Sequence, residues 1–108
     1  MNEDFMNIKR ESVKHMVGPG WSKIIDYLYD NLPIPKEIQV YQVKEKFGGL
    51  RFYISGATKE QYEIIDEACA LSEKTCETCG EPATVKSDGY WLICLCDKCF
   101  EEYKNRRN

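Results

Sequence analysis

Residues 76–99 read CETCGEPATVKSDGYWLICLCDKC, a stretch with a Cys-x-x-Cys pair at each end. Cys76 and Cys79 form the first pair and Cys96 and Cys99 the second, and sixteen residues separate the two pairs. Two thiolates three positions apart can hold one metal ion, and this separation lies in the range of four-cysteine zinc sites. We therefore expect these four cysteines to bind one Zn²⁺ ion.

The residues between the pairs predict how this segment folds. Gly80 lets the chain turn back after the first pair. Residues 83–85 and 90–93 predict two short strands, joined by a turn at Asp88-Gly89. The second pair runs into a stretch that predicts a terminal helix. A knuckle, a hairpin and ligands at a helix start occur in this order in a treble-clef finger; a zinc ribbon is the alternative.

The chain has six cysteines, so two remain outside this set. Cys94 could replace Cys96 as a ligand, but Cys96 preserves the two-residue gap and Cys94 alternates as a strand residue. Cys69 falls on the apolar face of a predicted helix, where we expect an inert buried thiol. Disulfides or a redox dithiol are the alternative for the cluster. We expect neither, since no secretion signal opens the sequence and neither pair sits in a βαβ pattern.

Four cysteines complete the coordination shell of zinc, so the site is expected to be structural rather than catalytic. The single histidine, His15, is far away in sequence and is expected to lie on the surface. Small modules of this kind depend on zinc to fold, with the ion contributing on the order of 10 kcal/mol. Trp91 and Tyr90 are expected to be core residues of the module, and contact residues only if they are exposed.

Residues 1–74 predict an α+β core of two helices, a hairpin and a third helix. The helices are expected over residues 3–16, 21–31 and 58–74, with an extended connection at Pro33 and Pro35. Thr58 and Gln61 form a capping-box pattern at the start of the third. The expected buried faces are Phe5, Ile8, Ser12 and Met16 in the first helix, Trp21, Ile24, Ile25, Leu28 and Leu32 in the second, and Tyr62, Ile65, Ala68, Cys69 and Leu71 in the third. Residues 75–108 form the zinc module, which is expected to pack on this core as one unit.

The hairpin is expected over residues 38–55, where two alternating runs flank Gly48-Gly49. In the first run Ile38, Val40 and Gln42 are expected on one face and Gln39, Tyr41 and Val43 on the other. In the second run Leu50, Phe52 and Ile54 face one way and Arg51, Tyr53 and Ser55 the other.

Charged and aromatic residues crowd around this hairpin turn. Candidate partner-binding residues are Lys44, Glu45, Lys46, Arg51 and Tyr53. They could bind phosphate or an acidic partner. The alternative is a solvated strand edge, charged to discourage pairing with another sheet.

The KEKFGGLRFY string at residues 44–53, the Gly20-Trp21 pair and the two Cys-x-x-Cys pairs with a Trp between them resemble a family of small uncharacterised proteins. Its members occur in phages, prophages and bacteria, and the resemblance spans residues 18–99. It implies a zinc-ribbon-like protein with a phage association and no established activity. It also favours a functional role for the charged hairpin residues, whereas residues 47–50 are more simply explained as turn-forming or buried.

Three classes of function follow, and we favour a non-enzymatic protein that binds a host or phage protein as an inhibitor, anti-defence factor or adaptor. A nucleic-acid-binding module using Lys44, Lys46, Arg51 and the basic tail at residues 103–107 is the alternative. It is disfavoured by the formal net charge of −3. An enzyme is least expected, since Glu45 is a single carboxylate without a visible catalytic set. No run approaches the ~20 apolar residues of a membrane span, and we expect a cytoplasmic protein, in the bacterial host if phage-encoded.

Overall fold

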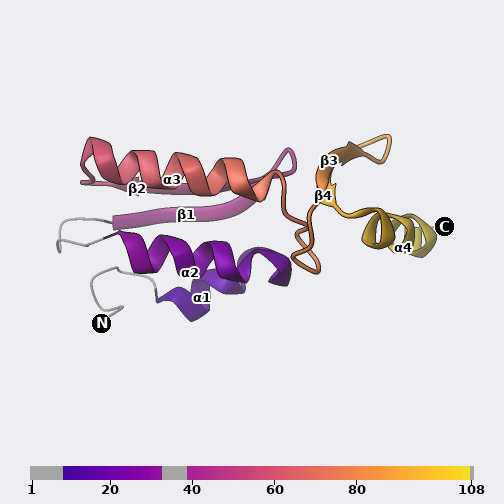
Figure 1. The fold of residues 1–108 in the computed structure, drawn as a ribbon, viewed down its shortest axis with the longest axis horizontal. Coiled ribbons are helices and arrows are strands. Elements are labelled where there is room, and N and C mark those ends of the chain that lie inside the picture. The colour runs from indigo at the N-terminus through magenta and orange to yellow at the C-terminus, as the bar shows by residue number, and fades with distance from the viewer. Residues whose placement is uncertain (1–8, 33–38, 108) are drawn as a thin grey trace.

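The computed structural model describes residues 9–32 and 39–107 of the 108-residue chain. Helices and small antiparallel sheets alternate along it, which confirms the α+β class (Figure 1). The elements are α1 (Arg10–Lys14), the 3-10 turn η2 (Pro19–Trp21), α2 (Ser22–Asn31), β1 (Gln39–Lys46), β2 (Gly49–Ser55), α3 (Lys59–Ser72), β3 (Thr84–Ser87), β4 (Leu92–Leu95) and α4 (Asp97–Arg107).

Helix α2 carries the predicted apolar face of the second helix. All five residues of that face are at least 97% buried: Trp21, Ile24, Ile25, Leu28 and Leu32. Their i, i+3, i+4 spacing places them along one side of the helix, where they face the hairpin and α3. This confirms the interpretation of the stretch as an amphipathic helix.

Helix α1 differs from the expectation. Phe5 and Ile8 lie outside the described residues, and Met16 is 44% exposed, while Val13 is the fully buried residue. The helix ends after Lys14, two residues earlier than predicted. Ion pairs fasten it to α2, since Asp26 accepts hydrogen bonds from Lys14 Nζ at 2.9 Å and from Arg10 Nη1 at 3.0 Å. The predicted stripe was wrong at Ser12 and Met16, which are exposed, and it omitted the buried Val13.

Strands β1 and β2 form the predicted hairpin, with one irregularity. The register shifts between Val40 and Gln42, so that Tyr41 is left without an opposite residue in β2. This bulge puts Val40 and Val43 on the same buried side, although strict alternation assigned them to opposite faces. In β2 the alternation holds, and Leu50, Phe52 and Ile54 are buried.

The hairpin turn is one residue earlier than the Gly-Gly pair predicts. Lys46 pairs with Gly49, which leaves Phe47 and Gly48 as the two turn residues. Both have positive φ, 57° and 82° respectively. A two-residue turn of this kind is type I′, whose backbone matches the twist of the strands.

Helix α3 begins at the predicted capping box, where Thr58 Oγ1 accepts from Gln61 N–H and Gln61 Oε1 accepts from Thr58 N–H. The helix lies along the outer edge of β2 (Figure 1), and Ser72 Oγ accepts the Leu50 N–H at 2.8 Å. Ile65 and Ala68 are buried and Cys69 is half-buried. The expectation was wrong for two other residues of that face, because Tyr62 and Leu71 are 41% and 49% exposed.

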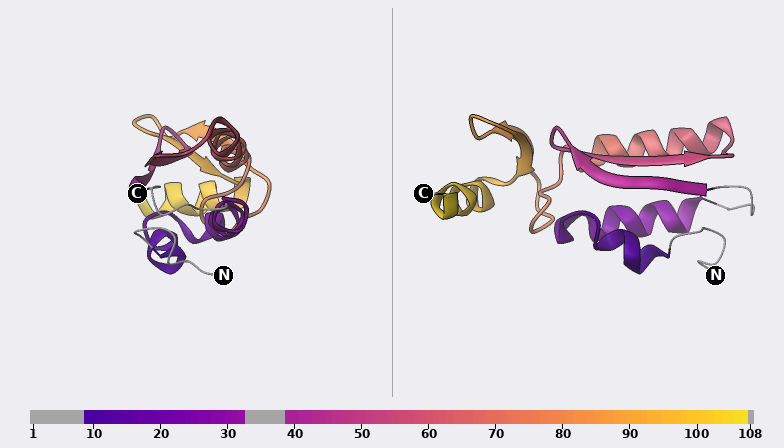
Figure 2. Two further views of the ribbon diagram at one scale, coloured as in Figure 1. Left: turned by 90° about the vertical axis from the view of Figure 1, so that its left-hand side faces the viewer. Right: turned by 180° about the vertical axis from the view of Figure 1, so that it is seen from behind.

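Strands β3 and β4 and helix α4 lie beyond one end of this core, as the front and rear views show (Figures 1 and 2). The predicted strands were one to two residues early, and the connecting loop is Asp88–Trp91. Residues 103–107, predicted as a basic tail, continue α4. Within the part of the chain that the structure describes, no helix has the length and apolar character of a membrane span.

Candidate functional site

The fold brings the four predicted ligand cysteines together. Cys76, Cys79, Cys96 and Cys99 place their sulfur atoms within 4.8 Å of one another, and the Cys79 and Cys96 sulfurs are 3.7 Å apart. Cys76 and Cys99 are buried, while Cys79 is exposed. A group of four sulfurs this compact can hold a metal ion.

Each pair has the local geometry of a metal-binding knuckle. The Cys79 N–H points at the Cys76 sulfur at 3.4 Å, and the Cys99 N–H points at the Cys96 sulfur at 3.5 Å. Burial by itself would raise the pKa of Cys76, but backbone N–H groups of Cys96, Cys79 and Thr78 lower this pKa to about 6. Such donors favour the thiolate of Cys76, which is the metal-binding form of cysteine, whereas burial and the neighbouring thiols raise the pKa of Cys99.

The remaining cysteines and the histidine stay outside this group. Cys94 is fully buried, but its thiol donates to the Thr75 carbonyl at 3.3 Å. Cys69 is half-buried on α3, and burial raises its pKa. His15 is exposed after α1. The preference for Cys96 over Cys94 thus agrees with the cluster that the structure forms.

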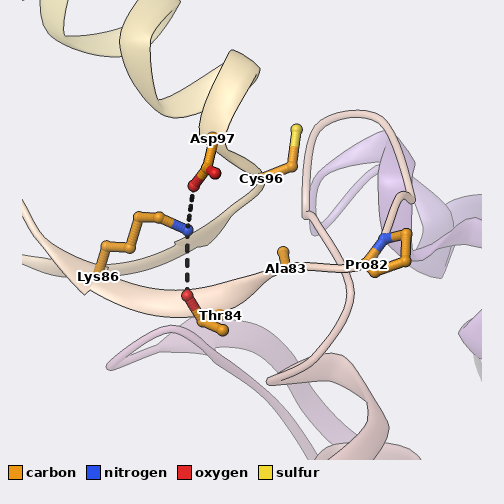
Figure 3. Close-up of a pocket in the computed structure, with 6 residues that line it drawn as sticks. All are labelled: Pro82, Ala83, Thr84, Lys86, Cys96 and Asp97. Atoms are coloured by element: carbon orange, nitrogen blue, oxygen red, sulfur yellow. Dashed lines mark hydrogen bonds and ion pairs between the residues drawn. The ribbon is translucent and has the colours of Figure 1, made fainter.

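Lys86 fixes the backbone that carries the second pair. It reaches from β3 toward Thr84 and Asp97 (Figure 3), with Nζ at 3.1 Å from Thr84 Oγ1 and 3.6 Å from Asp97 Oδ1. The same Nζ donates to the Leu95 carbonyl. Lys86 therefore ties β3 to the end of β4, next to Cys96, and to the first turn of α4, which contains Cys99.

The first knuckle docks directly on the turn before α2. Glu77 accepts two backbone N–H groups there: its Oε2 accepts from Gly18 at 3.0 Å and its carbonyl from Gly20 at 2.7 Å. Trp21 Nε1 donates to the Thr75 carbonyl at 2.8 Å. A Cβ on Gly20 would lie 2.1 Å from the Cys76 carbonyl oxygen, so this position requires glycine. The cysteine cluster and the core are thus joined backbone to backbone.

The predicted partner-binding residues divide into two groups. Cross-strand pairing places Lys44 opposite Arg51, and Lys46 is two positions from Lys44, so the three cations share the outward face of the hairpin. Tyr53 is 45% exposed. Glu45 differs, because its carboxylate accepts the Gly48 N–H at 2.8 Å and so supports the turn.

The structure also contains a groove that the sequence analysis missed. The tip of the β1–β2 hairpin meets the β3–β4 sheet and leaves a cavity of about 410 Å³ between them. We name it the hairpin groove; its lining residues are Glu45, Lys46, Phe47, Trp91, Leu92 and Ile93. Phe47 is 61% exposed, Trp91 65% and Leu92 44%.

Trp91 and Tyr90 were wrongly expected in the module core. Tyr90 is 80% exposed, even more than Trp91, because both lie in the loop between β3 and β4 rather than in a strand. Asp88 holds this loop: its Oδ1 accepts the Tyr90 and Trp91 N–H groups at 2.8 and 2.7 Å, and its Oδ2 accepts the Tyr103 hydroxyl at 2.6 Å. The sequence analysis used the Asp-Gly pair only to predict a turn. An Asp side chain in a turn can also accept hydrogen bonds from the backbone N–H groups that follow it, and this was the signal that was missed.

Comparisons with models of protein families, with curated proteins and with solved structures found no match to this chain.

Proposed function

We propose that Cys76, Cys79, Cys96 and Cys99 hold one structural Zn²⁺ ion. Tetrahedral zinc with Zn–S bonds of about 2.3 Å separates its sulfurs by roughly 3.8 Å. The 3.7 Å between the Cys79 and Cys96 sulfurs fits this value. A first pair on a knuckle, an intervening hairpin and a second pair entering α4 favour a treble-clef arrangement.

The apolar contacts of the C-terminal module support the need for a metal. Its cluster has three buried residues within the described chain, Cys76, Leu95 and Cys99, and two of these are proposed ligands. So small a core gives little burial to offset the conformational entropy of about 30 residues. Zinc supplies the missing folding free energy.

We further propose that the zinc-stabilised chain acts by binding a protein partner and not by catalysis. Four thiolates fill the zinc shell and leave no position for water or substrate. The observation that carries the binding role is the hairpin groove, where Phe47 and Trp91 expose apolar surface on a rigid frame. Apolar patches rimmed by polar groups mark interaction sites. An inhibitor or adaptor acting on a host or phage protein fits this surface.

Nucleic acid is the second candidate partner. Lys44, Lys46 and Arg51 on the outward hairpin face, with exposed Tyr53 beside them, are the observation that favours it. Helix α4 adds little to a basic surface, because Asp97, Glu101 and Glu102 stand among its cations.

The binding role is tested by affinity capture on zinc-loaded protein from bacterial lysate. The wild type and the control Tyr41→Ser, which removes an exposed aromatic ring outside the groove, should retain the same protein in stoichiometric amount. Trp91→Ser should lose it. Equal retention by all three chains would contradict the groove's role, and retention that nuclease treatment abolishes would favour the second candidate.

A further inference from the structure

The hairpin groove is preformed, because contacts on both sides fix its walls. On one side the hairpin tip is seated on β3, where a Cβ added to Gly48 would come within 2.8 Å of Val85 Cγ1. On the other side Asp88 holds the backbone of Trp91. Fixed walls lower the entropic cost of binding, since little must be ordered when a ligand enters.

Phe47 has no evident structural reason to occupy the turn. It is the only non-glycine residue with positive φ among the described residues, and its ring is 61% exposed. The first position of a type I′ turn favours Asn, Asp or Gly, which tolerate this conformation far better than a bulky aromatic side chain. A strained residue that contributes little burial points to a role in binding.

The charged groups around the groove differ in what they contact. Glu45 and Asp88 keep their negative charge but are directed at backbone and hydroxyl groups, since Glu45 accepts the Gly48 N–H and Asp88 accepts three groups of the loop and α4. Lys44 and Lys46 form no ion pair with any residue of the described ranges, and Lys46 Nζ lies 5.3 Å from the centre of the Phe47 ring. An apolar cleft with the ammonium group of Lys46 in its lining, and Lys44 two positions along the same strand face, complements a ligand that is apolar at its centre and negative on the side of these two lysines.

We propose that the hairpin groove binds a segment of a partner protein in which one or two bulky apolar side chains are flanked by carboxylates. The apolar side chains lie between Phe47 and Trp91 over Leu92 and Ile93, and the carboxylates face Lys44 and Lys46. This inference rests on the proposed protein-binding function and specifies the chemistry of the partner.

A single-stranded nucleic acid fits the groove less well. Leu92 and Ile93 contribute aliphatic surface, whereas bases stack on aromatic faces along a continuous basic track. The chain has a formal net charge of −3, and four zinc-bound thiolates make it more negative. The phosphates of a nucleic acid would have to overcome repulsion from this net negative charge.

Two ten-residue peptides and an oligonucleotide test the proposal on full-length, zinc-loaded protein. The first peptide carries a central Leu-Phe pair flanked by glutamates, the second has lysines in place of the glutamates, and the oligonucleotide is a ten-nucleotide deoxythymidine strand. Amide and indole shifts are followed by NMR. The glutamate peptide should cause saturable shifts of the Trp91 indole and the Gly48 amide, while the buried indole of Trp21 serves as an internal reference.

Phe47→Asn separates binding from folding. Asn is favoured at this turn position, so the variant should unfold at a higher temperature than the wild type while binding the glutamate peptide about tenfold more weakly. Lys46→Glu should weaken binding of the same peptide and reduce its dependence on salt.

Three results would overturn the inference: saturation by the lysine peptide with equal affinity, saturation by the oligonucleotide alone, or unchanged affinity in Phe47→Asn. The first leaves the proposed protein-binding function standing and rejects the acidic partner. The second rejects both. The third rejects Phe47 as the anchor while the capture experiment with Trp91→Ser still tests the groove itself.

Discussion

Cys94 and Cys96 are two positions apart and face different surroundings. Cys96 joins the sulfur cluster, whereas Cys94 points toward the Thr75 carbonyl. Alternation along β4 does not explain the difference in direction, because residues two positions apart in a strand point to the same side. What separates them is that β4 ends at Leu95, so Cys96 already belongs to the turn into α4.

We therefore expect opposite effects on zinc binding when each of the two cysteines is replaced by serine. Cys96→Ser should lose stoichiometric zinc, because a three-thiolate shell with a hydroxyl is a weaker site. Cys94→Ser should keep the metal and lose only about 1 kcal/mol of stability. Zinc content by mass spectrometry under native conditions checks both. If Cys96→Ser kept one zinc and Cys94→Ser lost it, Cys94 rather than Cys96 would be the ligand.

Asp26 gives a second prediction at this scale, on pH dependence. The hydrogen bond from Lys14, with that from Arg10, lowers the pKa of Asp26 below its ordinary value of 3.8. Because the pKa of Asp26 is lower in the folded than in the unfolded state, its ion pairs stabilise the fold fully above pH 3.8. This stabilisation is lost as the pH falls through the pKa of the folded state. The pair is partly exposed, so Asp26→Asn should cost only about 0.5–1 kcal/mol at pH 7.

The measurement is denaturant unfolding of the wild type and Asp26→Asn from pH 7 to pH 2. The difference in unfolding free energy between the two proteins should shrink as the pH falls below 3.8. Release of zinc in acid affects both proteins equally and therefore does not contribute to this difference. A difference that is constant over this range would show that Asp26 contributes through packing rather than charge.

At the scale of elements, the turn at residues 18–21 decides how the segment that carries Cys76 and Cys79 meets the core. Gly18 and Gly20 give their N–H groups to Glu77, and the missing Cβ of Gly20 allows the Cys76 carbonyl to approach. The sequence indicated only that this turn ends one helix and precedes another. Its role as a docking surface depends on a segment more than 50 residues away, which local patterns cannot reveal.

Gly20→Ala should therefore loosen the knuckle from the core. The added Cβ overlaps backbone atoms on the other side of the contact, and the cost is roughly 1–3 kcal/mol. Lys23→Ala, at an exposed position one turn along α2, is the matched control and should change the unfolding free energy little. Thermal unfolding of both variants measures the difference, and an equal effect of the two substitutions would contradict the docking role.

Several elements were predictable from the sequence because their signals are local. The amphipathic stripe of α2, the capping box of α3 and the spacing of the cysteine pairs each depend on residues a few positions apart. The bulge at Tyr41, the shift of the turn to Phe47 and the exposure of Trp91 depend on packing between distant segments. For that reason the cysteine cluster was found in advance and the hairpin groove was not.

At the scale of the whole molecule, the described residues form two apolar clusters of unequal size. The larger unites the helices α1 to α3 with the β1–β2 hairpin, and Cys94 is the one buried residue from the C-terminal module that it includes among the described residues. The smaller surrounds the sulfur cluster. Because the larger cluster draws almost all of its residues from upstream of the knuckle, it should remain folded without metal.

Chelation of zinc is therefore expected to unfold one part of the chain and spare the other. Amides of β3, β4 and α4 should lose protection from hydrogen exchange, while those of α2, β2 and α3 should keep most of theirs. Hydrogen exchange followed by NMR, before and after treatment with a chelator, resolves the two parts. Loss of protection throughout would show that the core depends on the metal as well.

The proposed zinc ion at Cys76, Cys79, Cys96 and Cys99 is the central claim, and one measurement tests it most directly. Protein purified without chelator is analysed for metal content, and X-ray absorption at the zinc edge gives the ligands. We predict one zinc per chain, bound by four sulfurs at about 2.3 Å. Metal-free protein, or a mass reduced by the hydrogens lost to disulfides, would contradict the claim.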